Sequence, residues 1–278
     1  MTADLIDAVA VVVPARDEAE RLPGCLASVL VAARACRVPV AVVVVLDGCR
    51  DDSLAVARRA LARHRGPWRV VDAAASCVAD VRDDGIETAL TMLRTRGHDG
   101  AIWVANTDAD TRVPVDWLKG QVALAEAGAD LVAGYAALDD DPVLSPRARH
   151  AYAAYMAARA RDDGTHVHVY GANLGMRAST WRSVGGFPRV TVGEDTALVN
   201  AVTRAGGRVV RPVEPTVVTS ARRHGRAPGG LAALLDTLEW SCGARHAGAP
   251  CTTAPLCEGE AGLSGGAGAA GVPREGAA

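Results

Sequence analysis

The sequence predicts an α/β fold with a mostly parallel sheet flanked by helices, in a single domain followed by a tail. Two observations lead to this fold class. Continuous apolar runs, such as Val9 to Pro14 and Val40 to Leu46, are typical of strands buried on both faces. Segments with helical periodicity alternate with these runs, which indicates βαβ units. A chain of 278 residues is also long enough to bury a large core without disulfides.

The alternation is regular in the first half of the chain. Strands are expected at residues 9–14, 40–46, 68–71, 101–105 and 130–136, and helices at residues 20–34, 51–64, 83–94 and 114–127. Pro114 stands where the last of these helices would start, because proline is favoured in the first helical turn.

The second half is less regular. Helices are expected at residues 145–161, 194–205 and 231–240, strands at 166–170, 208–211 and 217–219, and a turn at 171–173. From residue 241 onward Gly, Ala, Pro and Cys dominate, and such a composition buries too little apolar surface to offset its ordering entropy. Residues 1–240 are therefore predicted to form the domain and residues 241–278 a disordered Gly/Ala-rich tail.

Composition excludes several classes of partner. The formal net charge of −2 offers no basic surface for a nucleic acid. The longest apolar run, residues 38–46, is far shorter than the roughly 18 residues that span a bilayer, so no transmembrane segment is expected. The N-terminus lacks a basic region before its apolar stretch, which predicts no signal peptide and a cytoplasmic protein. The seven cysteines form no CxxC pair, which is typical of reduced thiols rather than a zinc or disulfide framework.

Polar clusters follow three of the predicted strands. They are Arg16–Glu18, Asp47, and Asp108 with Asp110, and ligands bind α/β sheets at this carboxyl edge. Two carboxylates at i and i+2 can hold Mn²⁺ or Mg²⁺ and, through it, a substrate phosphate. The alternative for Asp108 and Asp110 is a solvated acidic turn.

Two further clusters have both a chemical and an ordinary interpretation. Glu194 and Asp195 open a helix, where acidic residues are favoured anyway, but either could serve as a general base. Arg222, Arg223 and His224 lie in a short basic segment that could clamp a diphosphate, with His224 as a third metal ligand, or could be a solvated loop.

His166 and His168 alternate in a predicted strand and so share a face. Ordinary packing is favoured over a metal pair at these two positions. The sequences GxGxxG, GxxxxGK[ST], HExxH and GxSxG are absent, which argues against dinucleotide oxidoreductases, P-loop NTPases, zinc proteases and α/β-hydrolases.

Five segments in order resemble the family 2 glycosyltransferases. They are VVVPARDEAERLPGCLASV, VVVVLDGCRDDS, IWVANTDADTRVPVDWL, YGANLGMRASTWRSVGGFP and GEDTALVNAV, and the resemblance covers about residues 8–226. The ending VVTSARRHGRAPGG looks most like a soluble, actinobacterial-type subgroup.

The resemblance implies a GT-A fold and inverting transfer of a sugar from a nucleotide-diphosphate sugar to a hydroxyl of a small-molecule, lipid or glycan acceptor, with Mn²⁺ or Mg²⁺. Residues 8–136 would bind the donor and residues 137–240 the acceptor. It implies these roles: Pro14, Ala15, Arg16, Glu18 and Asp47 around the nucleoside; Asp108, Asp110 and His224 on the metal; Arg222 and Arg223 on the diphosphate; Asp195 as catalytic base with Glu194 positioning the acceptor; and Gly171, Ala172 and Asn173 as a wall between donor sugar and acceptor.

The sequence departs from the family pattern at residues 76–85, SCVADVRDDG, where relatives carry a Gly- and Asn-bearing stretch with an arginine. Arg82 is expected to reach the donor from this segment. Leu46 stands where relatives often have a second acid, and the tail has no counterpart.

Two alternatives remain open. A sugar-phosphate nucleotidyltransferase would need a Gly-rich, basic loop after the first strand, which PARDEAERLPG does not supply. A non-catalytic nucleotide-sugar binding module would bind a donor without turnover.

Overall fold

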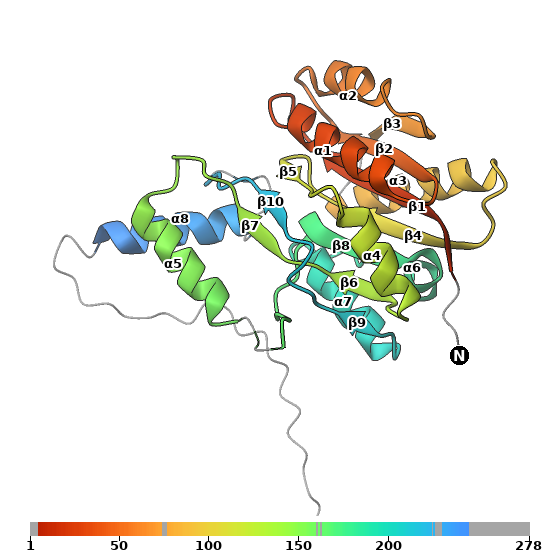
Figure 1. The fold of residues 1–278 in the computed structure, drawn as a ribbon. Coiled ribbons are helices and arrows are strands. Elements are labelled where there is room, and N and C mark those ends of the chain that lie inside the picture. The colour runs from red at the N-terminus through yellow and green to blue at the C-terminus, as the bar shows by residue number, and fades with distance from the viewer. Residues whose placement is uncertain are drawn as a thin grey trace, which may run out of the picture.

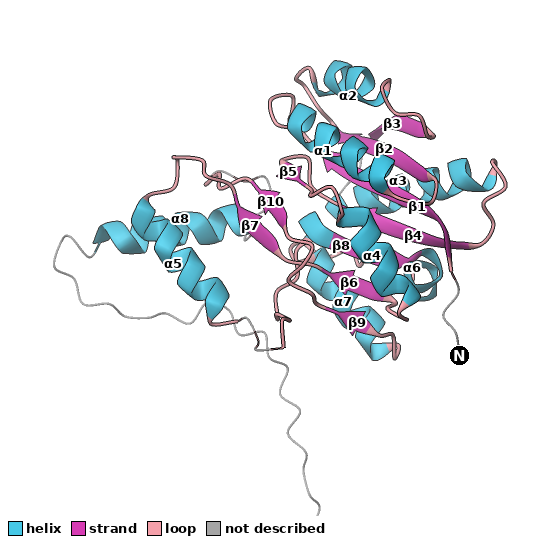
Figure 2. Cartoon of the chain, in the orientation of Figure 1, coloured by secondary structure: helices cyan, strands magenta, loops and turns pink. Residues whose placement is uncertain are grey.

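The computed structural model describes residues 5–73, 77–159, 161, 163–223, 225 and 230–244. A seven-stranded sheet lies at the centre with helices on both faces, and a smaller sheet with two helices lies to one side (Figures 1 and 2). The predicted fold class, a mostly parallel sheet flanked by helices, is confirmed.

The large sheet has the strand order β3-β2-β1-β4-β8-β6-β9. Its strands are β1 (Ile6–Ala15), β2 (Val40–Asp47), β3 (Trp68–Ala73), β4 (Ala101–Asn106), β6 (Leu131–Ala133), β8 (Leu174–Arg177) and β9 (Val209–Val210). β1 pairs in parallel with both β2 and β4. Almost every residue of β1 and β2 is buried, because helices cover both faces of the sheet.

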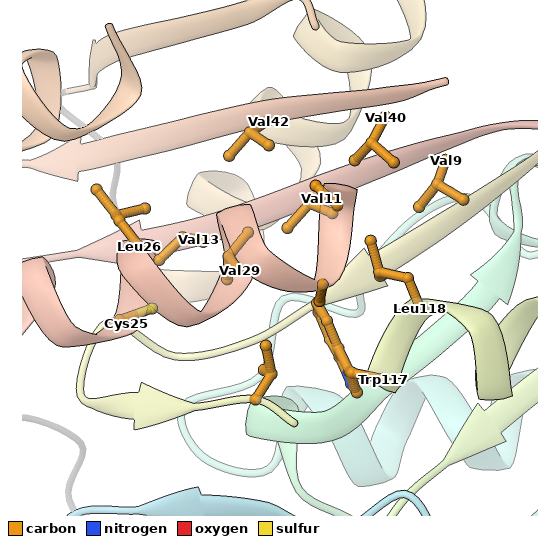
Figure 3. Packing of buried hydrophobic residues seen from close by; sticks show 14 of the residues in the cluster. Val9, Val11, Val13, Cys25, Leu26, Val29, Val40, Val42, Trp117 and Leu118 are labelled. Atoms are coloured by element: carbon orange, nitrogen blue, oxygen red, sulfur yellow. The ribbon is translucent and has the colours of Figure 1, made fainter. Parts of the chain in front are cut away.

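Alternate side chains of the central strands enter two separate cores. Val9, Val11 and Val13 of β1 pack against α1 (Leu22–Ala35), and the same core includes α2 (Ser53–Leu61) and α4 (Trp117–Glu126) (Figure 3). Ala8, Ala10 and Val12 face the opposite core, which is built by α3 (Val78–Arg94), α6 (Ala178–Ser183) and α7 (Glu194–Arg204). The two-residue period of a strand therefore produces a three-layer arrangement.

The smaller unit has its own apolar cluster. Its sheet has the order β5-β10-β7, from β5 (Thr111–Arg112), β10 (Val217–Thr219) and β7 (Ala136–Leu138). The helices α5 (Pro146–Ala157) and α8 (Leu231–Ala244) pack together beside it in Figure 1. Among the helices that the structure describes, none is long and apolar enough to cross a membrane.

Several elements differ from the prediction. β8 and α6 were not expected, and β8 runs antiparallel to both of its neighbours in the middle of the sheet. The strand expected at residues 130–136 is divided into β6 and β7, which belong to different sheets.

Other expected elements are missing or have different bounds. The residues 166–170 form no strand, and Thr165 makes an isolated bridge to Pro212. α3 begins at Val78 rather than at residue 83, and α4 begins at Trp117, after a turn that Pro114 opens. α8 continues to Ala244, past the predicted end of the domain at residue 240, and the remainder of the expected tail lies outside the described residues.

A glycine allows β8 to enter the sheet. Gly175 pairs with Ala105 of β4 and Val132 of β6, and a methyl group at this position would lie 2.2 Å from Oε1 of Gln121 and 2.7 Å from the Trp103 ring. Both side chains are fully buried and joined by a hydrogen bond of 2.8 Å from Trp103 Nε1 to Gln121 Oε1. The glycine is required here because neither neighbour has room to move.

We therefore expect Gly175→Ala to lower the free energy of unfolding by about 1–3 kcal/mol, the usual cost of overpacking a core. Urea unfolding followed by circular dichroism measures this change. The matched control is Gly24→Ala in α1, where the nearest atom to the new methyl group is Arg112 Cδ at 3.9 Å and stability should stay equal or rise. Equal stability of the two variants would contradict the assignment of Gly175 as a close-packing position.

Candidate active site

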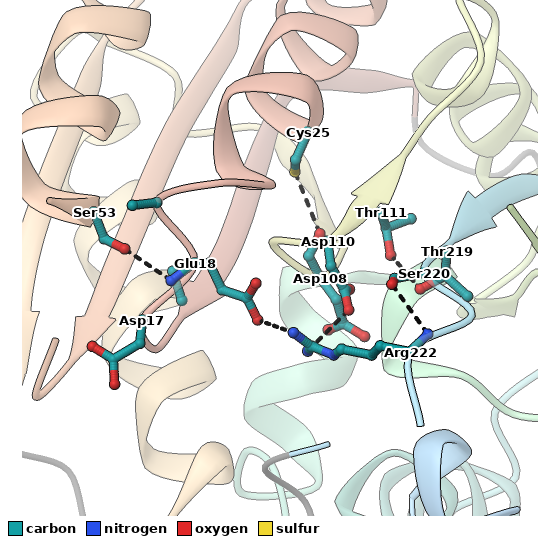
Figure 4. A network of polar contacts seen from close by, with 12 residues as sticks. Asp17, Glu18, Cys25, Ser53, Asp108, Asp110, Thr111, Thr219, Ser220 and Arg222 are labelled. Atoms are coloured by element: carbon teal, nitrogen blue, oxygen red, sulfur yellow. Dashed lines mark hydrogen bonds and ion pairs between the residues drawn. The ribbon is translucent and has the colours of Figure 1, made fainter. Parts of the chain in front are cut away.

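The polar residues expected at the carboxyl edge of the sheet do lie together. The loops after β1, β2 and β4 meet at this edge, and Figure 4 shows Glu18, Asp108 and Asp110 around the guanidinium of Arg222. The parallel register explains the meeting, because three neighbouring strands end on the same side of the sheet.

Arg222 joins two carboxylates from different loops. Its Nη1 lies 2.7 Å from Glu18 Oε1 and its Nη2 lies 2.9 Å from Asp110 Oδ2. The backbone brings these partners together through the pairing of β5 with β10, where the buried hydroxyl of Thr111 donates to that of Thr219 at 2.9 Å. Asp110 precedes this threonine pair and Arg222 follows it along the chain.

Arg82 makes a second bridge. It lies on α3, its side chain is 3% exposed, and Nη2 lies 2.8 Å from Asp108 Oδ1 while Nε lies 3.5 Å from Glu194 Oε1. Nε and Nη1 have no hydrogen-bond partner in the described part of the chain. A methyl group on Gly171 would lie 2.4 Å from Arg82 Nη2, so the absence of a side chain there lets the guanidinium approach the site.

The N-terminus of α7 holds the two remaining acids. Asp195 Oδ2 accepts from the N–H of Gly171 at 2.9 Å, and its Oδ1 accepts from the N–H of Thr196 at 2.6 Å. Burial raises the pKa of the Asp195 carboxyl, and the nearby charge of Glu194 raises it further, against the opposing effect of Arg82. The expected base thus lies beside Gly171, one of the three expected wall residues.

Burial also perturbs Asp110. It raises the pKa of this carboxyl to about 6, and the charges of Asp108 and Glu18 add to the increase, while Arg222 opposes it. Beneath the loop, the Cys25 thiol donates to the backbone carbonyl of Asp108 at 3.3 Å. Burial and the same carboxylates raise the pKa of this thiol, which keeps it protonated.

The expected nucleoside side of the site is built from the first two loops. Arg16 Nη1 lies 3.5 Å from Asp47 Oδ2, just beyond the buried Ala15 and the half-buried Pro14. In the same loops, Asp17, Cys49 and Asp51 have ligand atoms within 4.8 Å of one another. Their carboxylates accept backbone N–H groups of Arg50 (2.7 Å), Ala19 (2.9 Å) and Ser53 (3.0 Å), so they hold the two loops together.

The structure separates some expected residues from the site. The amide of Asn173 is buried and bonded entirely inside the fold, so its side chain does not form a wall toward a donor. The amide instead supports the short 3₁₀ helix η1 (Gly171–Asn173), in which Ala172 is also buried. Arg223 lies 3.6 Å from Asp236 of α8 rather than beside Asp110. His224, the expected third ligand, lies outside the described residues.

His166 and His168 share a side, as expected, but within an aromatic cluster rather than a metal pair. Their rings are stacked at 6.1 Å, and His168 also stacks on Tyr170 at 5.6 Å. Burial lowers the pKa of both histidines, that of His168 to about 4. Both rings are therefore neutral near pH 7.

Sequence reasoning missed the pairing of Thr111 with Thr219 and the hydrogen bond from the Glu18 N–H to Ser53 Oγ at 2.9 Å. No local pattern marks either contact, because the partners lie 108 and 35 residues apart. The only signal for these contacts in the sequence is weak: a threonine or serine hydroxyl that becomes buried requires a hydrogen-bond partner.

The raised pKa of Asp110 predicts a pH-dependent stability. The folded carboxyl has a pKa of about 6 against an ordinary value of 3.8, so its stabilising contribution is greatest in acid and is lost as the pH rises through 6. Asp110→Asn is neutral at every pH. In EDTA, we expect its unfolding free energy relative to wild type to increase by about 2 kcal/mol between pH 4.5 and 7.5.

Urea unfolding at the two pH values measures this difference. Asp140→Asn, an exposed carboxylate on a loop, is the control and should track the wild type at both pH values. A difference between Asp110→Asn and wild type that does not change with pH would show that the Asp110 carboxyl titrates normally.

The chain resembles known proteins in sequence and fold. Residues 10–183 match the family model described as "Glycosyl transferase family 2". No protein of curated function matches at a significant level. The mannosyltransferase PcManGT from Pyrobaculum calidifontis, solved in complex with GDP-Man and Mn²⁺, has a TM-score of 0.55 and 18% identity over 89% of this chain and 77% of its own.

A second similar structure is S. aureus TarS 1–349 in complex with UDP-GlcNAc. Its TM-score is 0.55 with 14% identity over 80% of this chain, and the match spans 60% of the TarS chain. At these identities the two structures establish the common GT-A fold. The family model covers more than half of the chain, and the chain therefore belongs to glycosyl transferase family 2.

Proposed function

We propose that this glycosyltransferase moves a sugar from a nucleoside-diphosphate sugar to a hydroxyl group of its acceptor, with inversion at the anomeric carbon. The observation that carries the proposal is the junction of the Asp108–Asp110 loop with Glu194 and Asp195 through the buried guanidinium of Arg82. Groups suited to a diphosphate and a group suited to proton removal thus meet at one edge of the sheet.

The charge of the site fits a donor diphosphate with a divalent cation. Five carboxylates surround two guanidinium groups, so three negative charges are uncompensated when all are ionised; the acids are Glu18, Asp108, Asp110, Glu194 and Asp195. Asp108 and Asp110 offer the hard oxygen ligands that Mn²⁺ and Mg²⁺ accept. A bound cation would stabilise the charge that develops on the leaving diphosphate.

Arg82 fits the diphosphate itself. Among the described residues, its Nη1 has no partner and its Nε makes no hydrogen bond, lying 3.5 Å from Glu194 Oε1, and such incompletely satisfied donors of a buried guanidinium favour an anionic ligand. Arg222 supplies a second positive charge between Glu18 and Asp110. The two arginines would hold the phosphates, and Arg16 with Asp47 would contact the nucleoside.

Asp195 is the proposed general base. Each of its oxygens accepts one backbone N–H and retains a second lone pair for an acceptor hydroxyl. Its raised pKa brings the carboxylate closer to the basicity that proton removal near neutral pH needs. The acceptor oxygen bonds to the anomeric carbon as the bond from that carbon to the diphosphate oxygen breaks, and the hydroxyl proton passes to Asp195.

The similar structures support the donor class. PcManGT was solved with GDP-Man and Mn²⁺, and TarS with UDP-GlcNAc. These two donors differ in both base and sugar, so they support a nucleotide sugar as the substrate class without selecting one member of it.

The first test is donor turnover in a panel of UDP-, GDP- and dTDP-sugars with Mn²⁺ or with EDTA. We expect slow release of nucleoside diphosphate from one donor, with water as acceptor, and loss of release in EDTA. A donor that raises the melting temperature in Mn²⁺ but is never cleaved would indicate a binding module. Neither binding nor cleavage of any donor would refute the proposal.

The second test separates the roles of the acids. Asp195→Asn should lower kcat for the donor that the wild type cleaves by about 10²- to 10⁴-fold. The rise in melting temperature that this donor causes should stay near that of wild type. Asp110→Asn should abolish the additional rise in melting temperature that Mn²⁺ gives in the presence of the donor. The exposed control Asp140→Asn should change neither quantity, and normal kcat in Asp195→Asn would remove Asp195 as the base.

A further inference from the structure

We infer that Asp83 is a positioning residue that fixes the loop between α6 and α7 and thereby presents Glu194 and Asp195 to the donor site. The inference rests on the proposed function of Asp195. It starts from three contacts of one carboxylate on α3 with residues about a hundred positions later in the chain.

Asp83 accepts hydrogen bonds from both ends of a short segment. Oδ1 accepts from Trp181 Nε1 at 2.7 Å, and both oxygens lie 3.1 Å from the N–H of Phe187. The loop closes tightly around the carboxylate: Gly186 has φ +85°, and a methyl group there would lie 2.6 Å from Asp83 Oδ2. A left-handed glycine is required at this position both for the turn and for the contact.

The adjacent residue on α3 connects this tether to the site. Phe187, whose N–H binds Asp83, has its ring 5.8 Å from the guanidinium carbon of Arg82. Arg82 in turn contacts Asp108 and Glu194. Two consecutive residues of α3 therefore hold the loop. Asp83 binds the backbone N–H of Phe187, and Arg82 contacts the Phe187 ring and, at the far end of the loop, Glu194.

A second contact at the surface contributes less. Arg189 Nε lies 2.6 Å from Asp80 Oδ1, one helical turn before Asp83, but the arginine side chain is 79% exposed. Exposed ion pairs contribute little because water screens them. Asp83 is half-buried and makes three bonds, so it is the principal tether of the segment from Phe187 to Gly193, the N-cap of α7.

The consequence for catalysis is geometric. Asp195 follows the loop directly, and displacement of a reacting group by about 1 Å can cost on the order of 10²-fold in rate. Loss of the Asp83 carboxylate should therefore affect turnover more than donor binding, since Asp110 and Arg222 lie on other loops.

The experiment compares Asp83→Ala and Asp83→Asn with Asp84→Ala, the exposed neighbour on the same helix. We expect kcat for release of nucleoside diphosphate to fall by about 10- to 100-fold in Asp83→Ala and by less in Asp83→Asn, which keeps one acceptor oxygen. The shift in melting temperature caused by donor and Mn²⁺ should stay near that of wild type. Hydrogen exchange should accelerate in peptides covering residues 184–196 of Asp83→Ala alone.

A double variant separates positioning from a general loss of structure. If Asp83 acts through Asp195, adding Asp83→Ala to Asp195→Asn should lower kcat no further. A further drop of equal size would overturn the inference, as would Asp83 variants that match Asp84→Ala in both kcat and exchange. If the wild type cleaves no donor, the proposed function itself fails; if the wild type is active and only these comparisons fail, the inference alone is wrong.

Discussion

The position of Asp195, the proposed base, depends on the carboxamide of Asn173, which is hydrogen-bonded to three separate segments. Its Oδ1 accepts from Trp117 Nε1 at 2.9 Å and Gln121 Nε2 at 3.1 Å, both on α4. Its Nδ2 donates to the backbone carbonyls of Tyr135 (2.9 Å) and Pro215 (3.0 Å), at the starts of β7 and β10. A fully satisfied polar network in a low-dielectric interior is strong and specific in geometry. Two residues before Asn173, the N–H of Gly171 donates to Asp195, so the rigid amide network supports the position of the Asp195 carboxylate.

The other side of the site is organised by charge. Arginines and carboxylates alternate across loops that are distant in sequence, and each arginine contacts two acids rather than one. Burial of such groups costs stability, because desolvation is only partly offset by their attraction. The raised pKa of Asp110 is a direct sign of this cost. The arrangement is understandable if the acids bind a ligand. A divalent cation with a diphosphate would then compensate the negative charge that the arginines do not neutralise.

The sequence was most informative where structure is dictated by burial. β1, β2 and β4 are covered on both faces, so their apolar runs could be recognised, and the polar residues that follow them had to meet at one edge. β8 could not be recognised, because its four residues include a glycine and an arginine and its place in the sheet depends on a contact with Trp103 and Gln121. Residues 166–170 alternate like a strand but pair with no strand in the described part of the chain, so the pattern was misleading.

The same distinction applies to the candidate site. Asp108, Asp110 and Asp195 were expected from strand ends and a helix start, which are local features. The direction of the Asn173 side chain and the ion pair of Arg223 with Asp236 depend on tertiary packing, and no spacing in the sequence indicates them. The link from Asp83 to Phe187 spans 104 residues and is equally invisible in the sequence.

The place of β8 in the sheet has a consequence for the order of assembly. β6 precedes β8 in the sequence, yet β8 lies between β6 and β4 in the sheet. β1 pairs with β2 and β2 with β3, each the next strand along the chain, whereas β4 and β6 are joined through the later strand β8. Closure of such long loops is slow, because their entropy is lost before the contacts are gained. The strands β1 to β3 can therefore pair first, and the edge that carries the candidate site is completed late, when the four-residue β8 enters the gap beside β4.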